Sequence, residues 1–568
     1  RMDRALREFR IRGVSTNLSF VENVINHPKF IEGDYTTKFI DQNPELFNLR
    51  ERQDRSNLML KFLGDIAVNG NPELEGRETP SHFITPVLPK TPIKRQKDYK
   101  REVKGSRDLL LELGPKKFSD WMREQKEVLI TDTTMRDAHQ SLFATRMRSN
   151  DLWQIAPYYE ALMPELFSIE CWGGATFDVS MRFLNEDPWE RLVKLREMVP
   201  GTLFQMLLRG VNGVGYTSYP DNVIQFFVKQ AAEKGIDLFR IFDSLNIVEN
   251  MRVSMDSVLE ANKLVEGTVC YTSDIFDASR PKYQLSYYVK LAKELEKAGA
   301  HIIGIKDMSG VCRPEAARVL VKALKEEVGL PIHFHTHDTS GLSAATVLAA
   351  IEAGVDAVDA AMDSLSGLTS QPPMGSIIHA LKGTERASRI NVDAMHEIST
   401  YWEGVRSIYA PFESTLRSGT SDVYNHEMPG GQYTNLREQA RSMGLEPRWN
   451  EVSKSYAEVN KLLGDIVKVT PSSKVVGDMA LMMVTQDLTA ADVVDPDREI
   501  AFPQSVIGLL KGELGIPEGG FPEDITKKAL KDEKQIVGRP GAHLPPADLV
   551  AEKENLESYL GYEVTDAD

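Results

Sequence analysis

Short apolar runs, each ending on polar residues, recur through the middle of the chain. Between them lie segments such as YYVKLAKELEKAGA and AARVLVKALKEEVG, whose apolar residues have the three- and four-residue spacing of amphipathic helices. Continuous apolar runs are typical of strands buried on both faces, so the alternation predicts a parallel sheet covered by helices. The eight runs are 128–134, 166–172, 203–209, 238–244, 268–274, 301–307, 331–338 and 357–363.

Eight strand–helix units in a row, with no switch in order, favour a closed (β/α)8 TIM barrel over a doubly wound sheet. In this α/β fold the active site lies at the carboxyl ends of the strands. The polar residues at those ends are therefore the first candidates for function. They are Asp132, Asp137, Arg209, Asp243, Asp274, Lys306, His335, His337 and Asp363.

The segments that flank the predicted barrel carry weaker patterns. Residues 34–70 include a stretch with helical periodicity, FLGDIAVNG, and the Pro-rich stretch TPSHFITPVLPKTPIKRQ that follows is typical of an extended connector. From about position 395 the pattern is mostly helical, so we expect an additional C-terminal helical subdomain. The stretch GRPGAHLPP marks another boundary, after which we expect an acidic helix.

Composition narrows the classes of function. The chain has 568 residues and a formal net charge of -16, which argues against nucleic acid as a partner, because phosphates require clustered Lys and Arg. No apolar run is long enough to cross a bilayer and no signal peptide pattern opens the chain, so we expect no membrane partner. Cys171, Cys270 and Cys312 form no CxxC pair, which predicts a reducing compartment. The first residues do not include an initiator Met at position 1, so we expect a fragment.

The sharpest local pattern is HFHTHD at 333–338. Because side chains alternate along a strand, His335 and His337 share one face, with His333 deeper on the same side. A pair of histidines at the carboxyl end of a barrel strand can place two imidazoles on one metal. The alternative is a set of hydrogen-bonded core histidines, which we expect for His333 alone.

Further metal ligands must come from other strand ends. Asp137, after the first strand, is the best carboxylate, although an ordinary loop or cap residue is the alternative. Lys306 ends the apolar run IIGIK, where burial lowers the pKa of an amine. A neutral amine can react with carbon dioxide to form a carbamate, which is an anionic oxygen ligand. A buried lysine paired with Asp132 or Asp307 is the alternative, and the residues alone do not decide between the two.

Six longer motifs add a family resemblance. They are DTTMRDAHQSLFATRM, IECWGGATFDVSMRFL, FRIFDSLN, GIKDMSG, HFHTHD and NHEMPGGQYTNL. Together they resemble the carboxyltransferase of biotin-dependent carboxylases that act on pyruvate or oxaloacetate. In that family an aspartate, a carbamylated lysine and two histidines hold a divalent metal, and the matching positions are Asp137, Lys306, His335 and His337. The resemblance therefore favours an N6-carboxylysine at Lys306, and Zn, Mn and Co suit this ligand set about equally.

The resemblance also implies the substrate site. Arg136 and Arg209 match the family's substrate arginines, whose planar guanidinium groups can bind the pyruvate carboxylate bidentately. For Arg209 a salt bridge at the barrel rim is the alternative. Gln140 matches a residue that contacts the pyruvate carbonyl. With the metal, Arg136 and Gln140 would stabilise enolpyruvate before it attacks carbon dioxide to give oxaloacetate.

Biotin is the second cofactor that the resemblance implies. Asp178, Tyr216 and Ser473 match residues that line the pocket for the biotin ring. Thr470, in VTPSSK, matches the family's threonine that relays a proton between the pyruvate methyl group and biotin. The same residues also fit a helix start, with Thr470 as the N-cap and a proline in the first turn.

Three alternative functions stand beside this one. A barrel that cleaves or condenses acyl-CoA substrates also uses an aspartate and a histidine pair, but Lys306 argues against it. A catalytically inactive barrel would not require intact ligands and Arg209. An oxaloacetate decarboxylase or transcarboxylase subunit shares the barrel motifs. However, RMDRALREFRIRGVSTNLSFVENVINHPKF resembles the last segment of a biotin carboxylase domain, which favours a fragment of a pyruvate carboxylase.

The resemblance divides the chain into five segments. They are a remnant of the biotin carboxylase C-terminus at 1–33, a linker or allosteric segment at 34–110, the barrel core at 111–395, the helical part of the carboxyltransferase at 396–540 and the start of an interdomain segment at 541–568.

Partners follow from the same resemblance. The chain has no Met-Lys-Met biotinyl site, so biotin must arrive on a carrier domain outside it. Acetyl-CoA is the expected activator of the full-length enzyme, with Arg10, Arg12 and Arg55 as candidate phosphate contacts, for each of which a solvated surface charge is the equal alternative. We expect a homo-oligomer, either a dimer or a tetramer. Its location would be the cytoplasm of a bacterium, which we prefer, or the mitochondrial matrix of a eukaryote.

Overall fold

The computed structural model of the chain describes residues 1–9, 11, 16–49, 55–70, 88–92, 101, 103–413 and 416–565. It contains two compact units, Arg1–Thr85 and Pro86–Asp568. Most of the predicted Pro-rich connector lies outside the described residues, and so do Arg10, Arg12 and the side chain of Arg55.

The first unit is helical. Its small core is formed by Phe39 and Leu46, both buried, and the ring of Phe30 stacks on that of Tyr35 with 4.8 Å between centroids. The helices are α1 (Met2–Glu8), α2 (Leu18–Asn26), α3 (Pro28–Ile31), α4 (Phe39–Gln42) and α5 (Arg55–Asn69).

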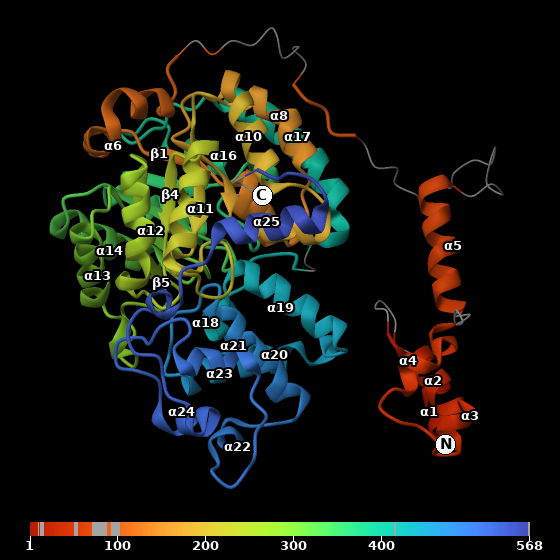
Figure 1. Cartoon of the computed structure of the whole chain (residues 1–568). Helices are drawn as coiled ribbons and strands as arrows, with labels where there is room; N and C mark the ends of the chain where they lie inside the picture. The colour runs from red at the N-terminus through yellow and green to blue at the C-terminus, as the bar shows by residue number, and fades with distance from the viewer. Residues whose placement is uncertain are drawn as a thin grey trace. The chain divides into compact units, whose positions relative to one another are not determined.

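The second unit is built around a closed barrel of eight parallel strands in chain order, which confirms the predicted (β/α)8 fold (Figure 1). The barrel closes where β8 pairs with β1, with Ala357 opposite Leu129. β5 begins earlier than the predicted run at 268, because the preceding residues continue the buried pattern. The strands are β1 (Leu129–Asp132), β2 (Ser168–Gly173), β3 (Leu203–Leu208), β4 (Leu238–Ile241), β5 (Leu264–Tyr271), β6 (Ile302–Asp307), β7 (Ile332–Thr336) and β8 (Ala357–Ala360).

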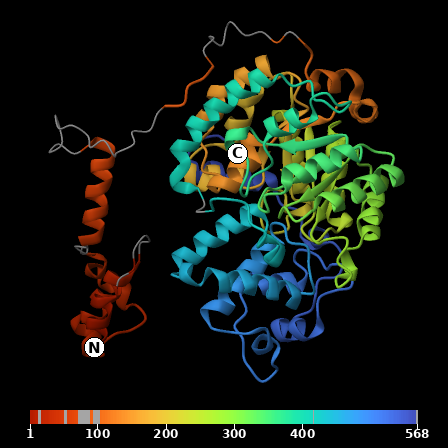
Figure 2. The ribbon, with the colours of Figure 1, turned by 180° about the vertical axis from the view of Figure 1, so that it is seen from behind.

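Helices surround this barrel, one after each strand, as the helical periodicity predicts (Figures 1 and 2). Their apolar faces pack with the strands in one large core. They are α8 (Ser149–Leu162), α10 (Pro188–Met198), α11 (Asp221–Lys234), α12 (Val248–Glu260), α13 (Leu285–Lys297), α14 (Pro314–Glu327), α15 (Ser343–Glu352) and α16 (Met374–Leu381).

The amino-terminal end of the barrel is covered by α6 (Ser106–Glu124). Phe118 and Met122 of this helix are fully buried and pack against the first residues of several strands, including Leu203 and Leu238. Because this end is sealed by apolar side chains, the carboxyl ends of the strands are left to form a site.

The C-terminal helical subdomain is confirmed. α17 (Val392–Tyr409) runs across the predicted boundary at 395 and packs on the barrel core through Trp402 and Val405. Most of the helices beyond it form a second core of their own, and in both ribbon views they lie beside the barrel (Figures 1 and 2). The helices of this second core are α19 (Gly430–Ser442), α20 (Trp449–Leu462), α21 (Ser472–Thr485), α22 (Ala490–Val494), α23 (Gln504–Lys511) and α24 (Glu523–Leu530). Val423 of α18 (Val423–His426) packs in the barrel core instead, and α25 (Leu549–Leu560) has no buried residue.

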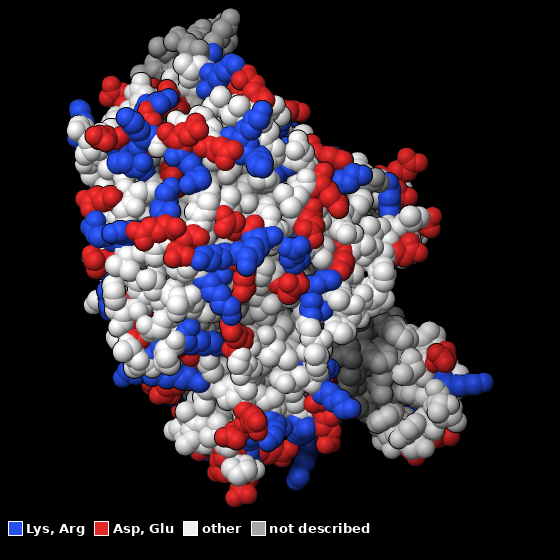
Figure 3. All heavy atoms as spheres, turned by 90° about the vertical axis from the view of Figure 1, so that its left-hand side faces the viewer, with Lys and Arg blue, Asp and Glu red and all other residues white. Residues whose placement is uncertain are grey.

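The surface is mixed in charge. On the face shown in Figure 3, basic side chains are interspersed with acidic ones instead of forming a basic stripe. Within the described ranges, no helix has the length and apolar character that crossing a membrane would require.

Candidate metal centre and substrate pocket

A cavity of about 770 Å³ lies at the carboxyl ends of the strands, between the barrel and the C-terminal helices. It brings together most of the residues that the sequence singles out. His335 and Ser473 do not line it, and both are fully buried. The predicted residues that line it are Arg136, Asp137, Gln140, Asp178, Arg209, Tyr216, Lys306, His337 and Thr470.

The first ligand segment follows β1. Residues Thr134–Ala138 form a π-helical turn that continues into α7 (His139–Phe143). This turn directs Arg136 and Asp137 inward, so that both side chains are buried. Asp137 lies inside the turn and caps no helix, so the alternative of an ordinary cap residue is wrong.

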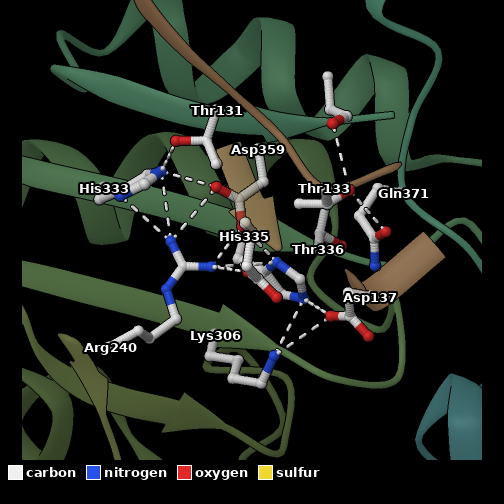
Figure 4. A network of polar contacts seen from close by, with 12 residues as sticks. Thr131, Thr133, Asp137, Arg240, Lys306, His333, His335, Thr336, Asp359 and Gln371 are labelled. Atoms are coloured by element: carbon white, nitrogen blue, oxygen red, sulfur yellow. Dashed lines mark hydrogen bonds and ion pairs between the residues drawn. The ribbon is translucent and has the colours of Figure 1, made fainter. Parts of the chain in front are cut away.

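Asp137, Lys306 and His335 meet at one point at the floor of the cavity (Figure 4), and His337 joins them there. The Asp137 carboxylate oxygen Oδ2 lies 3.3 Å from Nε2 of His335, 3.6 Å from Nε2 of His337 and 3.7 Å from Nζ of Lys306. The distance from Lys306 Nζ to His335 Nε2 is 3.1 Å. The Asp137 and histidine ligand atoms all lie within 4.8 Å of one another, which is the spacing expected around a metal ion.

Outer contacts fix the orientation of both imidazoles. His337 donates from Nδ1 to the Thr369 carbonyl at 2.6 Å, and His335 Nδ1 lies 2.5 Å from the Asp359 carboxylate. Because Nδ1 is engaged in each ring, Nε2 is directed toward Asp137 and is available as a ligand. Burial lowers the pKa of both histidines, which favours the neutral form that binds metals.

Lys306 is almost fully buried and pairs with Asp137. The alternative partners, Asp132 and Asp307, are wrong. Asp132 accepts a hydrogen bond from the Tyr159 hydroxyl at 2.7 Å, and Asp307 accepts two backbone N–H groups of the loop that follows it. Burial lowers the pKa of Lys306, although the charge of Asp137 opposes this.

The donor set fits a divalent metal ion. Among the described residues, the Oδ2 atom of Asp137 has no hydrogen-bond partner even though it is buried. Apart from its ion pair with Arg136, this oxygen faces two imidazole nitrogens and the Lys306 amine, so an ion bound among these groups would give it a further partner.

The two predicted substrate arginines have different surroundings. Arg136 forms ion pairs with Asp137 at 3.1 Å and with Glu170, and it donates to Oε1 of Gln140 at 3.3 Å. Arg209 donates to backbone carbonyl groups at 3.0 and 2.9 Å, and its guanidinium lies 5.1 Å from the ring centroid of Tyr216. No ion pair joins Arg209 to a carboxylate in the described part of the chain, so the rim salt bridge is not formed there.

The residues predicted for the biotin pocket differ in burial: Asp178 and Tyr216 line the cavity, whereas Ser473 does not. Asp178 pairs with Arg182 at 2.5 Å, and Tyr216 is 38% exposed at the cavity wall. Ser473 is fully buried, and its hydroxyl has no hydrogen-bond partner among the described residues. Thr470 lines the cavity. The N-cap interpretation of Thr470 is wrong, because α21 begins at Ser472 and its N-cap is Pro471.

A buried ionic network below the metal centre was not predicted (Figure 4). At its middle, Arg240 contacts the carboxylates of Glu170, Glu266 and Asp359. His333 lies 2.7 Å from both Glu266 and Asp359, and these charges raise its pKa to about 9 against the effect of burial. The signal was present in the sequence, since charged residues occur inside the apolar runs SIECW, LFRIF, LVEG and AVDA.

Three family models match the chain in succession. The biotin carboxylase C-terminal domain matches residues 1–42, an HMGL-like domain matches 224–401, and a conserved carboxylase domain matches 423–568.

Similar proteins agree with these matches. The pyruvate carboxylase of Bacillus subtilis (strain 168) is 52% identical over 568 residues, which is 100% of this chain and 49% of the relative. The chain thus spans about half the length of the curated relatives it matches.

Two solved structures are also similar. The carboxyl transferase domain of Rhizobium etli pyruvate carboxylase, solved with pyruvate and biocytin, is 61% identical with a TM-score of 0.84, covering 90% of this chain and 85% of that one. A Rhizobium etli pyruvate carboxylase solved with the allosteric activator acetyl coenzyme-A is 62% identical with a TM-score of 0.82, covering 100% of this chain and 53% of that one.

Proposed function

Because the chain belongs to the pyruvate carboxylase family and includes its carboxyl transferase domain, we propose that it transfers a carboxyl group from carboxybiotin to pyruvate to give oxaloacetate. The reverse direction is the decarboxylation of oxaloacetate. The observation that carries the proposal is the meeting of a carboxylate, two neutral imidazoles and a buried lysine at the floor of a cavity that also contains two arginines and Thr470.

Asp137, His335, His337 and a carbamylated Lys306 would hold the metal, which can be Zn, Mn or Co. Charge supports this assignment. A protonated Lys306 contributes +1 beside Asp137, and a carbamate (−1) together with a divalent ion (+2) also contributes +1. The exchange therefore leaves the charge of this buried cluster unchanged, which avoids the cost of burying an uncompensated charge. When bound, the metal supplies Lewis-acid stabilisation of the substrate's carbonyl oxygen.

The two arginines have separate tasks in this proposal. The guanidinium of Arg209 contacts backbone carbonyl groups but no carboxylate of the described chain, so it can bind the carboxylate of pyruvate. Arg136 is held by Glu170 and keeps its charge close to Gln140. Together, Arg136 and Gln140 stabilise the oxyanion that develops when the pyruvate methyl group loses a proton.

Thr470 moves the proton. After carboxybiotin has released carbon dioxide, the Oγ1 atom of Thr470 would take up a proton from the methyl group of pyruvate while it gives its own to the biotin ring, and the enolpyruvate would then attack the carbon dioxide. Asp178 and Tyr216 line the cavity and would bind that ring, whereas Ser473 is fully buried and does not line the cavity in this structure. The C-terminal helices above the cavity would exclude water from the reacting enolate.

The partners belong to the same proposal. Biotin arrives on a biotinylated carrier domain, and acetyl-CoA activates the full-length enzyme through Arg10, Arg12 and Arg55. A homo-oligomer, dimeric or tetrameric, located in the cytoplasm or the mitochondrial matrix, stays a prediction, as do the boundaries of the five segments.

The test is oxaloacetate decarboxylation by this chain with and without free biotin, on protein assayed for bound metal. We expect biotin-dependent formation of pyruvate that is lost in Lys306→Ala and His335→Ala, and loss of bound metal in the same variants. Metal-bound protein without biotin-dependent turnover would reject the proposal and favour a lyase-type activity. Near-normal turnover of Thr470→Ala with its metal intact would reject the relay alone.

A further inference from the structure

The position of Thr470 depends on a loop that does not belong to the barrel. The metal ligands lie on or directly after barrel strands, whereas Thr470 precedes α21 of the C-terminal helices. Among the described residues, the Thr470 hydroxyl has no hydrogen bond to hold it, so its place is determined by the backbone around it. The contacts between this loop and the barrel therefore determine how the Thr470 hydroxyl is aligned with the substrate.

Lys468, two positions before Thr470, makes the first attachment. Its side chain is 2% exposed, and its Nζ atom lies 2.9 Å from Oε2 of Glu427. It also donates to Oγ1 of Thr272 at 3.2 Å, directly after β5. Val469 and Thr470 line the cavity but Lys468 does not, so its ammonium group faces the barrel instead of the substrate.

Glu427 links three parts of the molecule. Its Oε1 atom accepts from Arg280, and its carbonyl accepts from Oγ of Ser309, after β6, at 2.8 Å. Its backbone has a φ of 54°, a left-handed conformation that is unfavourable for a residue with a side chain. Arg280 and Lys468 keep the pKa of Glu427 below its ordinary value, although burial opposes them. Glu427 is therefore a charged anchor on the barrel side of the loop.

A second attachment lies on the other side of Thr470. The hydroxyl of Ser472, which is fully buried, is 3.1 Å from the carbonyl oxygen of Ser244, in the loop that follows β4. It is also 2.7 Å from the carbonyl oxygen of Val467. Thr470 thus lies between two contacts with successive strand ends, one through Lys468 and one through Ser472.

We propose that Lys468 is a positioning residue, which holds the Thr470 hydroxyl over the substrate through its ion pair with Glu427 and its hydrogen bond to Thr272. This proposal rests on the proposed relay function of Thr470. A buried ion pair is weak evidence for stability, because desolvation offsets most of its attraction. Because the ion pair joins the Thr470 loop to the barrel, it can instead fix the distance between the Thr470 hydroxyl and the substrate. Proton transfer depends steeply on that distance.

The test compares Lys468→Met, Lys468→Arg and a matched control, Lys325→Met. The Lys325 ammonium pairs with Asp356 at 2.7 Å, before β8 and therefore at the opposite end of the barrel. We expect Lys468→Met to lower kcat for biotin-dependent oxaloacetate decarboxylation about 10- to 100-fold, with the KM for oxaloacetate and the bound metal unchanged. Lys468→Arg should recover part of the rate, and Lys325→Met should keep the full rate.

A double variant separates positioning from general damage. If Lys468 acts through Thr470, then Lys468→Met should slow Thr470→Ala no further, because the group that it positions is already absent. Equal losses in both backgrounds would overturn the positioning role while leaving the relay intact. Full activity of Thr470→Ala would overturn the relay and, with it, the positioning role.

Folding is checked by thermal unfolding of every variant. If Lys468→Met does not fold, Glu427→Gln takes its place in the same cycle, because it removes the charge of the ion pair and keeps an oxygen near Arg280. A folded Glu427→Gln variant with unchanged kcat would also reject the proposal.

Discussion

Replacing Asp359 by Asn should weaken metal binding although Asp359 is not itself a ligand. Its carboxylate lies 2.5 Å from Nδ1 of His335 and 2.7 Å from Nε2 of His333, and it is fully buried. Asn keeps the shape and an oxygen that can accept from the His335 ring, but it removes the negative charge that increases the basicity of that ring. Changes of this kind lower metal affinity about 10- to 100-fold, which corresponds to about 1.4 to 2.8 kcal/mol.

The same substitution also affects stability. Arg240 would keep Glu170 and Glu266 as partners, so its charge would not be left alone in the interior. We therefore expect Asp359→Asn to fold, with a free energy of unfolding lowered by no more than about 3 to 5 kcal/mol, which is the cost of breaking a buried pair outright.

The assay is a titration of metal-stripped protein with Zn²⁺, Mn²⁺ or Co²⁺ against a chromogenic chelator. Asp356→Asn is the matched control, because Asp356 is also buried and ion-paired but precedes β8, at the opposite end of the same strand. Asp356→Asn should keep the wild-type metal affinity. Equal affinity of folded Asp359→Asn and wild type would refute the reasoning.

Three further changes test other parts of the structure. Burial lowers the pKa of His426 to about 4, below the value of about 6.5 in an unfolded chain, so its contribution is complete above pH 6.5 and is lost as the pH falls toward 4. Wild type should lose about 2 kcal/mol more than His426→Asn between pH 7.5 and 5 in urea unfolding. In Gly430→Ala the added Cβ would lie 2.8 Å from Nδ1 of His337, so chelator titration should give a metal affinity about tenfold lower. Phe118→Ala, at the sealed end of the barrel, should lower the free energy of unfolding by about 3 to 5 kcal/mol and leave metal affinity unchanged.

The barrel could be predicted from the sequence because each strand is buried on both faces. Runs such as LFQMLL and HIIGIKD are continuous in apolar character, and every residue of β3 and β6 is buried. The predicted ends were less accurate, because polar residues that follow a strand continue the run without continuing its hydrogen bonds. For β4 the predicted run reaches 244, while the strand ends at Ile241.

Part of the candidate site was also predictable. The two-residue spacing of His335 and His337 on a strand is visible in the sequence, and Asp137 could be predicted because it follows β1. The partners of Lys306 were not predictable, because Asp132 and Asp307 are nearer in sequence to strand ends but are occupied by local hydrogen bonds. Only the closed barrel determines which carboxylate remains available to pair with Lys306.

The buried network was missed because its members lie on five strands, and only closure of the barrel brings them together. Glu170, Arg240 and Asp359 come from the alternate strands β2, β4 and β8, which share one interior layer. Glu266 and His333 join them from β5 and β7. At β6 the corresponding space is left open by Gly304, where a Cβ would lie 2.6 Å from the Glu266 carboxylate.

This layer explains how a barrel interior can hold a metal site rigidly. The charge of Arg240 holds Asp359 in place, Asp359 orients His335, and the register of β6 with β7 places Lys306 opposite His335. On the other side of Arg240, Glu170 holds Arg136 close to Gln140. A single buried guanidinium thus connects the metal ligands with the proposed substrate arginine, so a change at Arg240 would disturb metal affinity and substrate binding together, whereas a change at Asp359 would act mainly on the metal.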